Sequence, residues 1–161
     1  MSVANEFKKN MKATGFVETI ESVGFTLASD RIWFYRKRSD LIDCIILQPL
    51  AAGKGVRLSA SVLRLDMYPE YDASTFPKGF TSHARNIANK YISEDGIGFS
   101  TGDWDTSGVG RFEKAFSAIS DLLESDIVPW FDDIDSSQKL YDSIFEDLRT
   151  EGKYDYLLTL D

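Results

Sequence analysis

Apolar residues near the start of the chain recur with the spacing of an α-helix on both sides of Gly15: Val3, Phe7 and Met11 before it, and Phe16, Ile20 and Val23 after it. Steps of three and four residues place apolar side chains on one face of a helix. The second group lies on a face rotated from the first, and glycine is a common helix terminator. We therefore expect a helix that breaks near Thr14–Gly15 and ends by Gly24.

An alternating pattern follows and predicts an antiparallel sheet. The segments RIWFYRKR and LIDCIILQ are separated by Ser39–Asp40, which suits a two-residue hairpin turn. In that register three cross-strand pairs are expected: Arg36 with Asp43, Phe34 with Ile45, and Ile32 with Leu47. A third segment, GVRLSASVLRLD, alternates apolar and polar positions and extends the meander, with one face apolar throughout. We interpret Arg36 and Asp43 as a cross-strand ion pair.

Helical spacing returns in the second half of the chain. It predicts a helix over residues 84–92, at most a short strand near Ile97–Thr101, and a strong helix from Phe112 that stops before Pro129. Ser136 or Ser137 is expected to cap a last helix, and YDYLLTL suits either a strand or a helical turn. The predicted fold class is α+β, with an N-terminal helix, an antiparallel three- to five-stranded meander, and C-terminal helices packed on one face, in a single domain of residues 1–161.

The charge of the chain is concentrated in its last quarter. Residues 121–161 hold three Lys or Arg and twelve Asp or Glu, a net charge of −9, against −8 for the whole chain of 161 residues. Such a segment repels the phosphates of nucleic acids and attracts a cationic protein. The sequence shows no signal peptide or apolar membrane span, and Cys44 is its only cysteine. We expect a cytoplasmic protein that binds neither nucleic acid nor membrane.

Two groups of aspartates suggest metal ligands. DWDTSG, which starts at Asp103 and includes Asp105, resembles the start of a calcium-binding loop, but position twelve is Lys114 where a glutamate is required. Asp132, Asp133 and Asp135 suit magnesium. Acids just before a helix also stabilise its N-terminus, and no phosphate-binding loop is nearby. We expect no metal and no cofactor.

The remaining reactive side chains are also expected to have structural roles. His83 is the only histidine, and no nucleophile elbow or set of zinc ligands accompanies it. Cys44 lies within an apolar strand, which favours a buried thiol over a nucleophile. The cations and aromatics of RIWFYRKR suit a single-stranded nucleic-acid platform, although the negative net charge opposes it. Trp33 and Tyr35 occupy the second face of that strand, which either packs against a helix or lies open.

The stretch SDIVPWFDDIDSS combines acids with aromatic residues, a composition typical of an interface core with a polar rim. A solvated helix end is the alternative interpretation. We predict a partner-binding surface in which Trp130 is the anchor and the acids set the rate of association. Its contact residues are Asp126, Trp130, Phe131, Asp132, Asp133 and Asp135.

The chain resembles small bacterial proteins of the domain of unknown function 4304 type. The resemblance rests on a helix leading to VGFTL, then FYR, DLIDCIILQ, an alternating strand, and a late helix that runs into VPWF. It implies no catalytic residues. Such proteins resemble immunity or accessory proteins encoded beside secreted bacterial toxins, and the resemblance therefore implies a role in blocking a toxin.

The leading hypothesis is a non-enzymatic binding protein, an immunity protein that neutralises a cationic toxin by direct association. One alternative is a metal-dependent enzyme that uses Asp103 and Asp105, or Asp132, Asp133 and Asp135. Another is a structural or adaptor protein that binds through the Trp33 and Tyr35 face.

Overall fold

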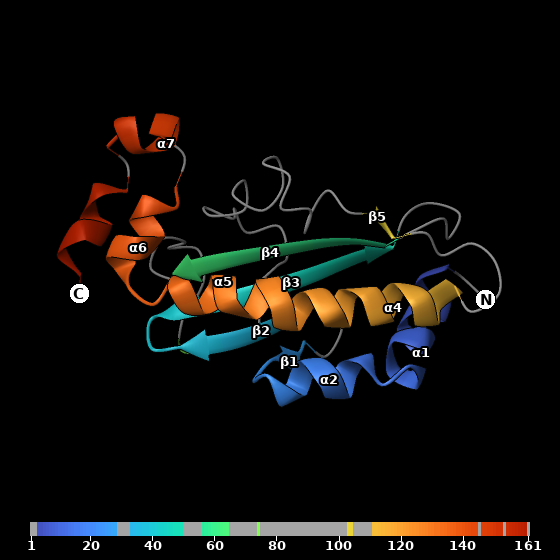
Figure 1. The fold of residues 1–161 in the computed structure, drawn as a ribbon. Helices are drawn as coiled ribbons and strands as arrows, with labels where there is room; N and C mark the ends of the chain where they lie inside the picture. The colour runs from blue at the N-terminus through green and yellow to red at the C-terminus, as the bar shows by residue number, and fades with distance from the viewer. Residues whose placement is uncertain are drawn as a thin grey trace.

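The computed structural model describes residues 3–28, 33–49, 56–64, 74, 103–104, 111–144, 146–152 and 154–160. Helices precede and follow an antiparallel sheet along the chain, and they pack against it in space (Figure 1). The α+β class is confirmed. No described helix is both long enough and apolar enough to cross a bilayer.

The sheet has five antiparallel strands in sequence order: β1 (Thr26–Leu27), β2 (Trp33–Arg38), β3 (Leu41–Pro49), β4 (Val56–Arg64) and β5 (Asp103–Trp104). The predicted hairpin register is confirmed, because Arg36 lies opposite Asp43 and Phe34 opposite Ile45. The predicted partner of Leu47, Ile32, lies outside the described residues. Ser39 in the turn has a positive φ of 51°. β5 lies at the start of the DWDTSG stretch, which resembled a calcium-binding loop in the sequence.

Two helices form the N-terminal part, α1 (Val3–Ala13) and α2 (Phe16–Ser22). The predicted break between them is confirmed. Gly15 adopts a φ of 78°, in the left-handed region that favours glycine, and this interrupts the right-handed helix at that residue. Four of the apolar residues on the two sides of the break are buried: Phe7, Met11, Phe16 and Ile20.

The prediction that a helix stops before Pro129 is wrong. The chain remains helical from α4 (Arg111–Leu122) through a π-helical segment, η3 (Leu123–Ile127), into α5 (Val128–Asp133). Proline lacks an N–H and crowds the carbonyl of the residue four positions earlier. In η3 the N–H of Val128 donates to the carbonyl of Leu123, five residues back. This wider turn carries the helix across the proline.

The C-terminal region folds into three short helices, α6 (Ser137–Asp142), α7 (Glu146–Thr150) and the 3-10 helix η4 (Asp155–Thr159). Ser136 caps α6 as predicted, because its side chain accepts a hydrogen bond from the N–H of Lys139 at 3.2 Å. The sequence suggested one continuous last helix, whereas the structure has two, interrupted near Ser143. Of the two alternatives for YDYLLTL, the structure shows the helical turn.

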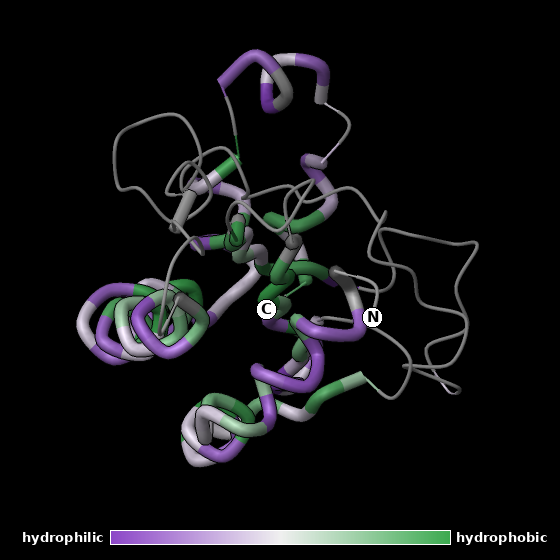
Figure 2. The backbone as a smooth tube through the Cα atoms, turned by 90° about the vertical axis from the view of Figure 1, so that its right-hand side faces the viewer, coloured by the Kyte–Doolittle hydropathy of each residue, from purple (hydrophilic) through white to green (hydrophobic). Residues whose placement is uncertain are grey.

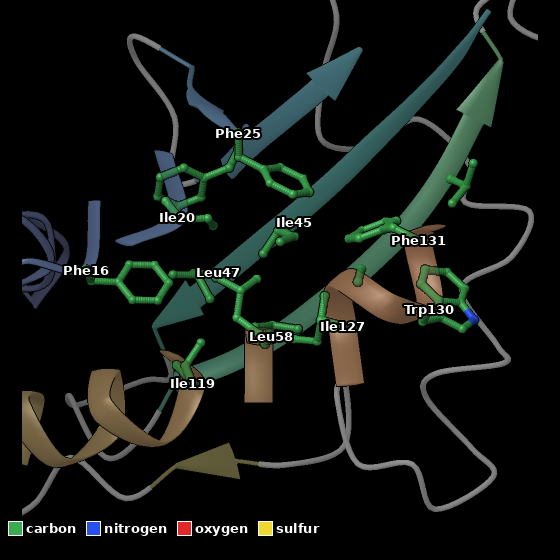
Figure 3. Close-up of a cluster of buried hydrophobic side chains, with 14 of the residues drawn as sticks. Phe16, Ile20, Phe25, Ile45, Leu47, Leu58, Ile119, Ile127, Trp130 and Phe131 are labelled. Atoms are coloured by element: carbon green, nitrogen blue, oxygen red, sulfur yellow. The ribbon is translucent and has the colours of Figure 1, made fainter. Parts of the chain in front are cut away.

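One face of the sheet packs against helices from both ends of the chain. Figure 3 shows Phe16, Ile45, Leu58, Ile127 and Phe131 meeting in this layer. Figure 2 shows the hydrophobic positions gathered toward the middle of the molecule and hydrophilic ones on outward turns of the helices. The predicted packing of the C-terminal helices on one face of the sheet is confirmed.

The second face of the sheet is also apolar. Trp33, Ile42, Cys44 and Leu63 are buried there, and Tyr35 and Ile46 are partly buried against them. Trp33 is therefore not available as the exposed platform that the nucleic-acid and adaptor interpretations require. Of the two alternatives for this face, packed or open, the structure shows it packed at Trp33.

Candidate partner-binding surface

The two aromatic residues predicted as partner contacts lie in the core. Phe131 is 0% exposed and Trp130 is 8% exposed, and Figure 3 shows both against the sheet-facing layer of side chains. The ring of Phe131 packs against Phe25, with the centroids 5.5 Å apart. The prediction that Trp130 anchors a partner is therefore corrected. The apolar face of an amphipathic helix packs against the core. Because the helix continues through both residues, their rings lie on that face.

Asp132 is exposed, but an arginine of the sheet neutralises it. Nη2 of Arg36 donates to Oδ1 of Asp132 at 3.0 Å, and Nε of Arg36 donates to Oδ2 of Asp43 at 2.8 Å. The guanidinium also lies 5.0 Å from the centre of the Phe25 ring. The predicted pair of Arg36 and Asp43 is confirmed and extends to the C-terminal part of the chain.

Asp43 is buried, and Arg38 is its second partner. Nε and Nη2 of Arg38 donate to the two carboxylate oxygens at 2.7 and 2.8 Å, a bidentate pair. Nη2 also donates to the carbonyl of Ile134 at 2.8 Å. Burial raises the pKa of Asp43, while the hydrogen bonds and charges of Arg38 and Arg36 oppose that rise. This network joins β2 and β3 to the end of α5.

Asp135 also has a cationic partner. It lies 3.0 Å from Nζ of Lys139, one helical turn later. The hydrogen bond and charge of Lys139 lower the pKa of Asp135. Exposed pairs of this kind contribute little to stability. Asp135 therefore presents less negative charge to a partner than its exposure suggests.

Asp126 and Asp133 remain as open carboxylates. Both are exposed, and neither forms an ion pair or hydrogen bond within the part of the chain that the structure describes. Asp121 and Glu124 share these properties. Residues 121–133, here called the acidic segment, contain five acids and no Lys or Arg. The segment spans the end of α4, η3 and α5, along one side of the molecule (Figure 1).

The metal hypotheses gain no support from the described residues. Asp132 and Asp135 are each paired with a different cation, and no group of three potential ligands assembles within the described ranges. Asp105, the second aspartate of the calcium-like pattern, lies outside these residues, and only the backbone of Asp103 is described.

The reactive side chains noted in the sequence contribute no catalytic arrangement that the structure describes. His83 lies outside the described residues. Cys44 is buried, and burial together with the negative charge of Asp43 raises the pKa of its thiol far above the ordinary range. Its thiol is therefore protonated and inaccessible, as expected for a structural cysteine.

The sequence did not reveal a polar pocket of about 170 Å³ beside Asp135. Its walls come from the β2–β3 turn, the end of β4 and the start of α6, and they include Arg38 and Arg64. Nη1 of Arg64 donates to Oγ of Ser137. One signal was present in the sequence, because Arg64 continues the alternation of Leu58, Ala60 and Val62 and so belongs to the apolar face. A cation at such a position needs polar partners.

The scan of the chain against protein-family models found no match, and neither the curated proteins nor the solved structures contain a significant match.

Proposed function

We propose that this chain is a non-enzymatic binding protein, an immunity protein that neutralises a cationic toxin by direct association in the cytoplasm. The observation that carries the proposal is the set of exposed, unpaired carboxylates in the acidic segment. The resemblance to bacterial proteins of the domain of unknown function 4304 type is a second ground for the proposal. A buried, reduced Cys44 is compatible with a reducing compartment.

Electrostatics supports a role for the acidic segment in association. Four open carboxylates within thirteen residues, without a neighbouring cation in that segment, repel one another and lower the stability of the fold. A basic partner removes this repulsion and is steered toward the segment. Such steering acts over about one Debye length, ~8 Å at physiological ionic strength. It raises the association rate more than it slows dissociation.

The contact set differs from the one that the sequence suggested. Asp126 and Asp133 carry the proposed contact, together with Asp121 and Glu124. Asp132 and Asp135 contribute less, because Arg36 and Lys139 neutralise them. Trp130 and Phe131 support the surface from the core side.

The proposal is tested first by finding the partner. The tagged chain is mixed with the separately purified products of the genes next to its own, at low and at high salt. We expect it to retain one basic protein and to release it as salt rises. Co-expression of the chain with that protein is expected to relieve its toxicity.

The contact residues are tested on that complex by stopped-flow binding. We expect Asp126→Asn combined with Asp133→Asn to lower the association rate at least about tenfold at low salt. The matched control is Glu146→Gln with Asp147→Asn, which makes the same change in net charge on exposed residues of α7. Equal effects of the two double variants would show that the acidic segment acts only through the net charge of the protein. No effect of the first would remove Asp126 and Asp133 from the interface.

A further inference from the structure

The pocket beside Asp135 has a cationic interior. Arg64 lines it, and the side chain of Arg64 is only 8% exposed. Arg38 is the second arginine in its wall. Asp43 and the carbonyl of Ile134 engage Nε and Nη2 of Arg38, while Nη1 has no hydrogen-bond partner among the described residues. Two guanidinium groups therefore border one small space, and that of Arg38 retains the free N–H donors of Nη1.

The mouth of the pocket is acidic. Asp40 and Asp135 also belong to its lining, and their side chains are 74% and 57% exposed. Asp40 lies 3.8 Å from Nη2 of Arg64, so the contact between them is loose. The arrangement separates positive charge at the floor from negative charge at the opening. Ser39, which has a positive φ, separates Arg38 from Asp40 in the sequence.

We propose that this pocket binds the carboxylate of a small zwitterion such as a free α-amino acid. The carboxylate accepts hydrogen bonds from Arg38 and Arg64, which suit planar oxygen pairs. The ammonium group lies toward Asp40, because Lys139 already pairs with Asp135. This site shares Asp135 with the predicted partner contacts but does not involve Asp126 or Asp133, so either proposal stands or fails without the other.

The size and charge of the pocket disfavour larger ligands, dianions and simple cations. A volume of about 170 Å³ has room for several water molecules, because one water needs at least about 10–15 Å³ of such space. Drug-sized ligands occupy pockets of at least about 300 Å³. Phosphate is small enough, but its second negative charge is repelled by Asp40 at the mouth. A simple cation is repelled by the arginines at the floor.

Thermal unfolding and calorimetric titration of the whole chain test the proposal. The ligands are glycine, N-acetylglycine, acetate, phosphate and methylammonium, each at the same ionic strength. We expect glycine to raise the melting temperature, because a ligand that binds only the native state stabilises it. We expect acetate to bind more weakly, and phosphate and methylammonium not to bind. Tighter binding of N-acetylglycine than of glycine would overturn the zwitterion assignment and indicate a peptide C-terminus as the carboxylate source.

Two variants locate the binding. Ser39→Asp introduces a carboxylate at the pocket, and aspartate tolerates a positive φ. We expect this variant to fold and to bind glycine at least about tenfold more weakly. Ser125→Asp, the same change at an exposed position of η3 outside the pocket, is expected to bind normally. Arg64→Gln is expected to abolish binding.

Three further outcomes would overturn the proposal: no response to any carboxylate, unchanged glycine binding by Ser39→Asp, or preference for phosphate.

Discussion

Replacing Phe131 by alanine tests whether this residue belongs to the core or to an interface. Its ring is fully buried and lies 5.5 Å from the ring of Phe25 and 5.1 Å from that of Trp130, between centroids. Burying a phenylalanine side chain contributes about 1.5–3 kcal/mol. Each aromatic contact adds about 0.5–1.5 kcal/mol. The two terms give about 2.5–6 kcal/mol, and measured Phe→Ala substitutions in cores cost about 3–5 kcal/mol.

We therefore expect Phe131→Ala to lower the free energy of unfolding by about 4 kcal/mol. Urea denaturation followed by tryptophan fluorescence measures the change. Phe131→Leu is the matched control, because it keeps an apolar side chain of similar bulk and is expected to cost about 1.5 kcal/mol or less. In the folded protein, we expect Phe131→Leu to leave the affinity for the partner unchanged.

Two results would refute this reasoning. A loss of less than about 1 kcal/mol for Phe131→Ala would place the side chain outside the core, since surface substitutions rarely exceed about 0.5 kcal/mol. Weakened partner binding by the stable Phe131→Leu variant would return the residue to the interface.

Three further substitutions test a buried ion pair, a helix cap and a glycine with positive φ. Arg38→Met removes one partner of the buried Asp43 and is expected to cost about 3 kcal/mol near pH 7. Because burial raises the pKa of Asp43 above its ordinary value of 3.8, this carboxyl takes up a proton at a higher pH in the folded protein than in the unfolded chain. The charge that Arg38 balances is then lost, so the cost should shrink as pH falls from neutral toward acid; urea denaturation across this range measures it, and a cost that grows toward acid pH contradicts the assignment. Ser136→Ala removes the N-cap of α6 and should cost about 1 kcal/mol by the same measurement, with Ser125→Ala at an exposed position of η3 as the comparison. Gly15→Ala should cost about 1 kcal/mol through its positive φ alone, because a Cβ there meets no atom within 4 Å; an unchanged melting temperature would refute this.

Much of the architecture followed from local patterns in the sequence. The break at Gly15, the Ser39–Asp40 turn and the pairing of Arg36 with Asp43 were all predicted and are all present. Each depends on residues close together in the chain, where periodicity and turn chemistry act directly. The cap at Ser136 belongs to the same class.

Pro129 shows where a local rule fails. The rule that proline ends a helix assumes that the preceding turn remains an α-turn. Here the buried side chains of Leu123 and Ile127 hold the segment against the core, and a π-turn accommodates the proline. Continuing the helix is what carries Trp130 and Phe131 into the core. Composition alone did not indicate that these two aromatic residues face the core.

The sequence by itself determined the fold class, the sheet register and the concentration of negative charge near the C-terminus. Only the tertiary structure decided which acids remain open. Arg36 neutralises Asp132 from 96 positions away along the chain, while Asp126 and Asp133 have no such partner among the described residues. It also decided that Arg38, Arg64 and Asp135 border one pocket. The physical reason is the same in both cases: periodicity orients a side chain about its own helix or strand, whereas its electrostatic environment depends on elements distant in sequence.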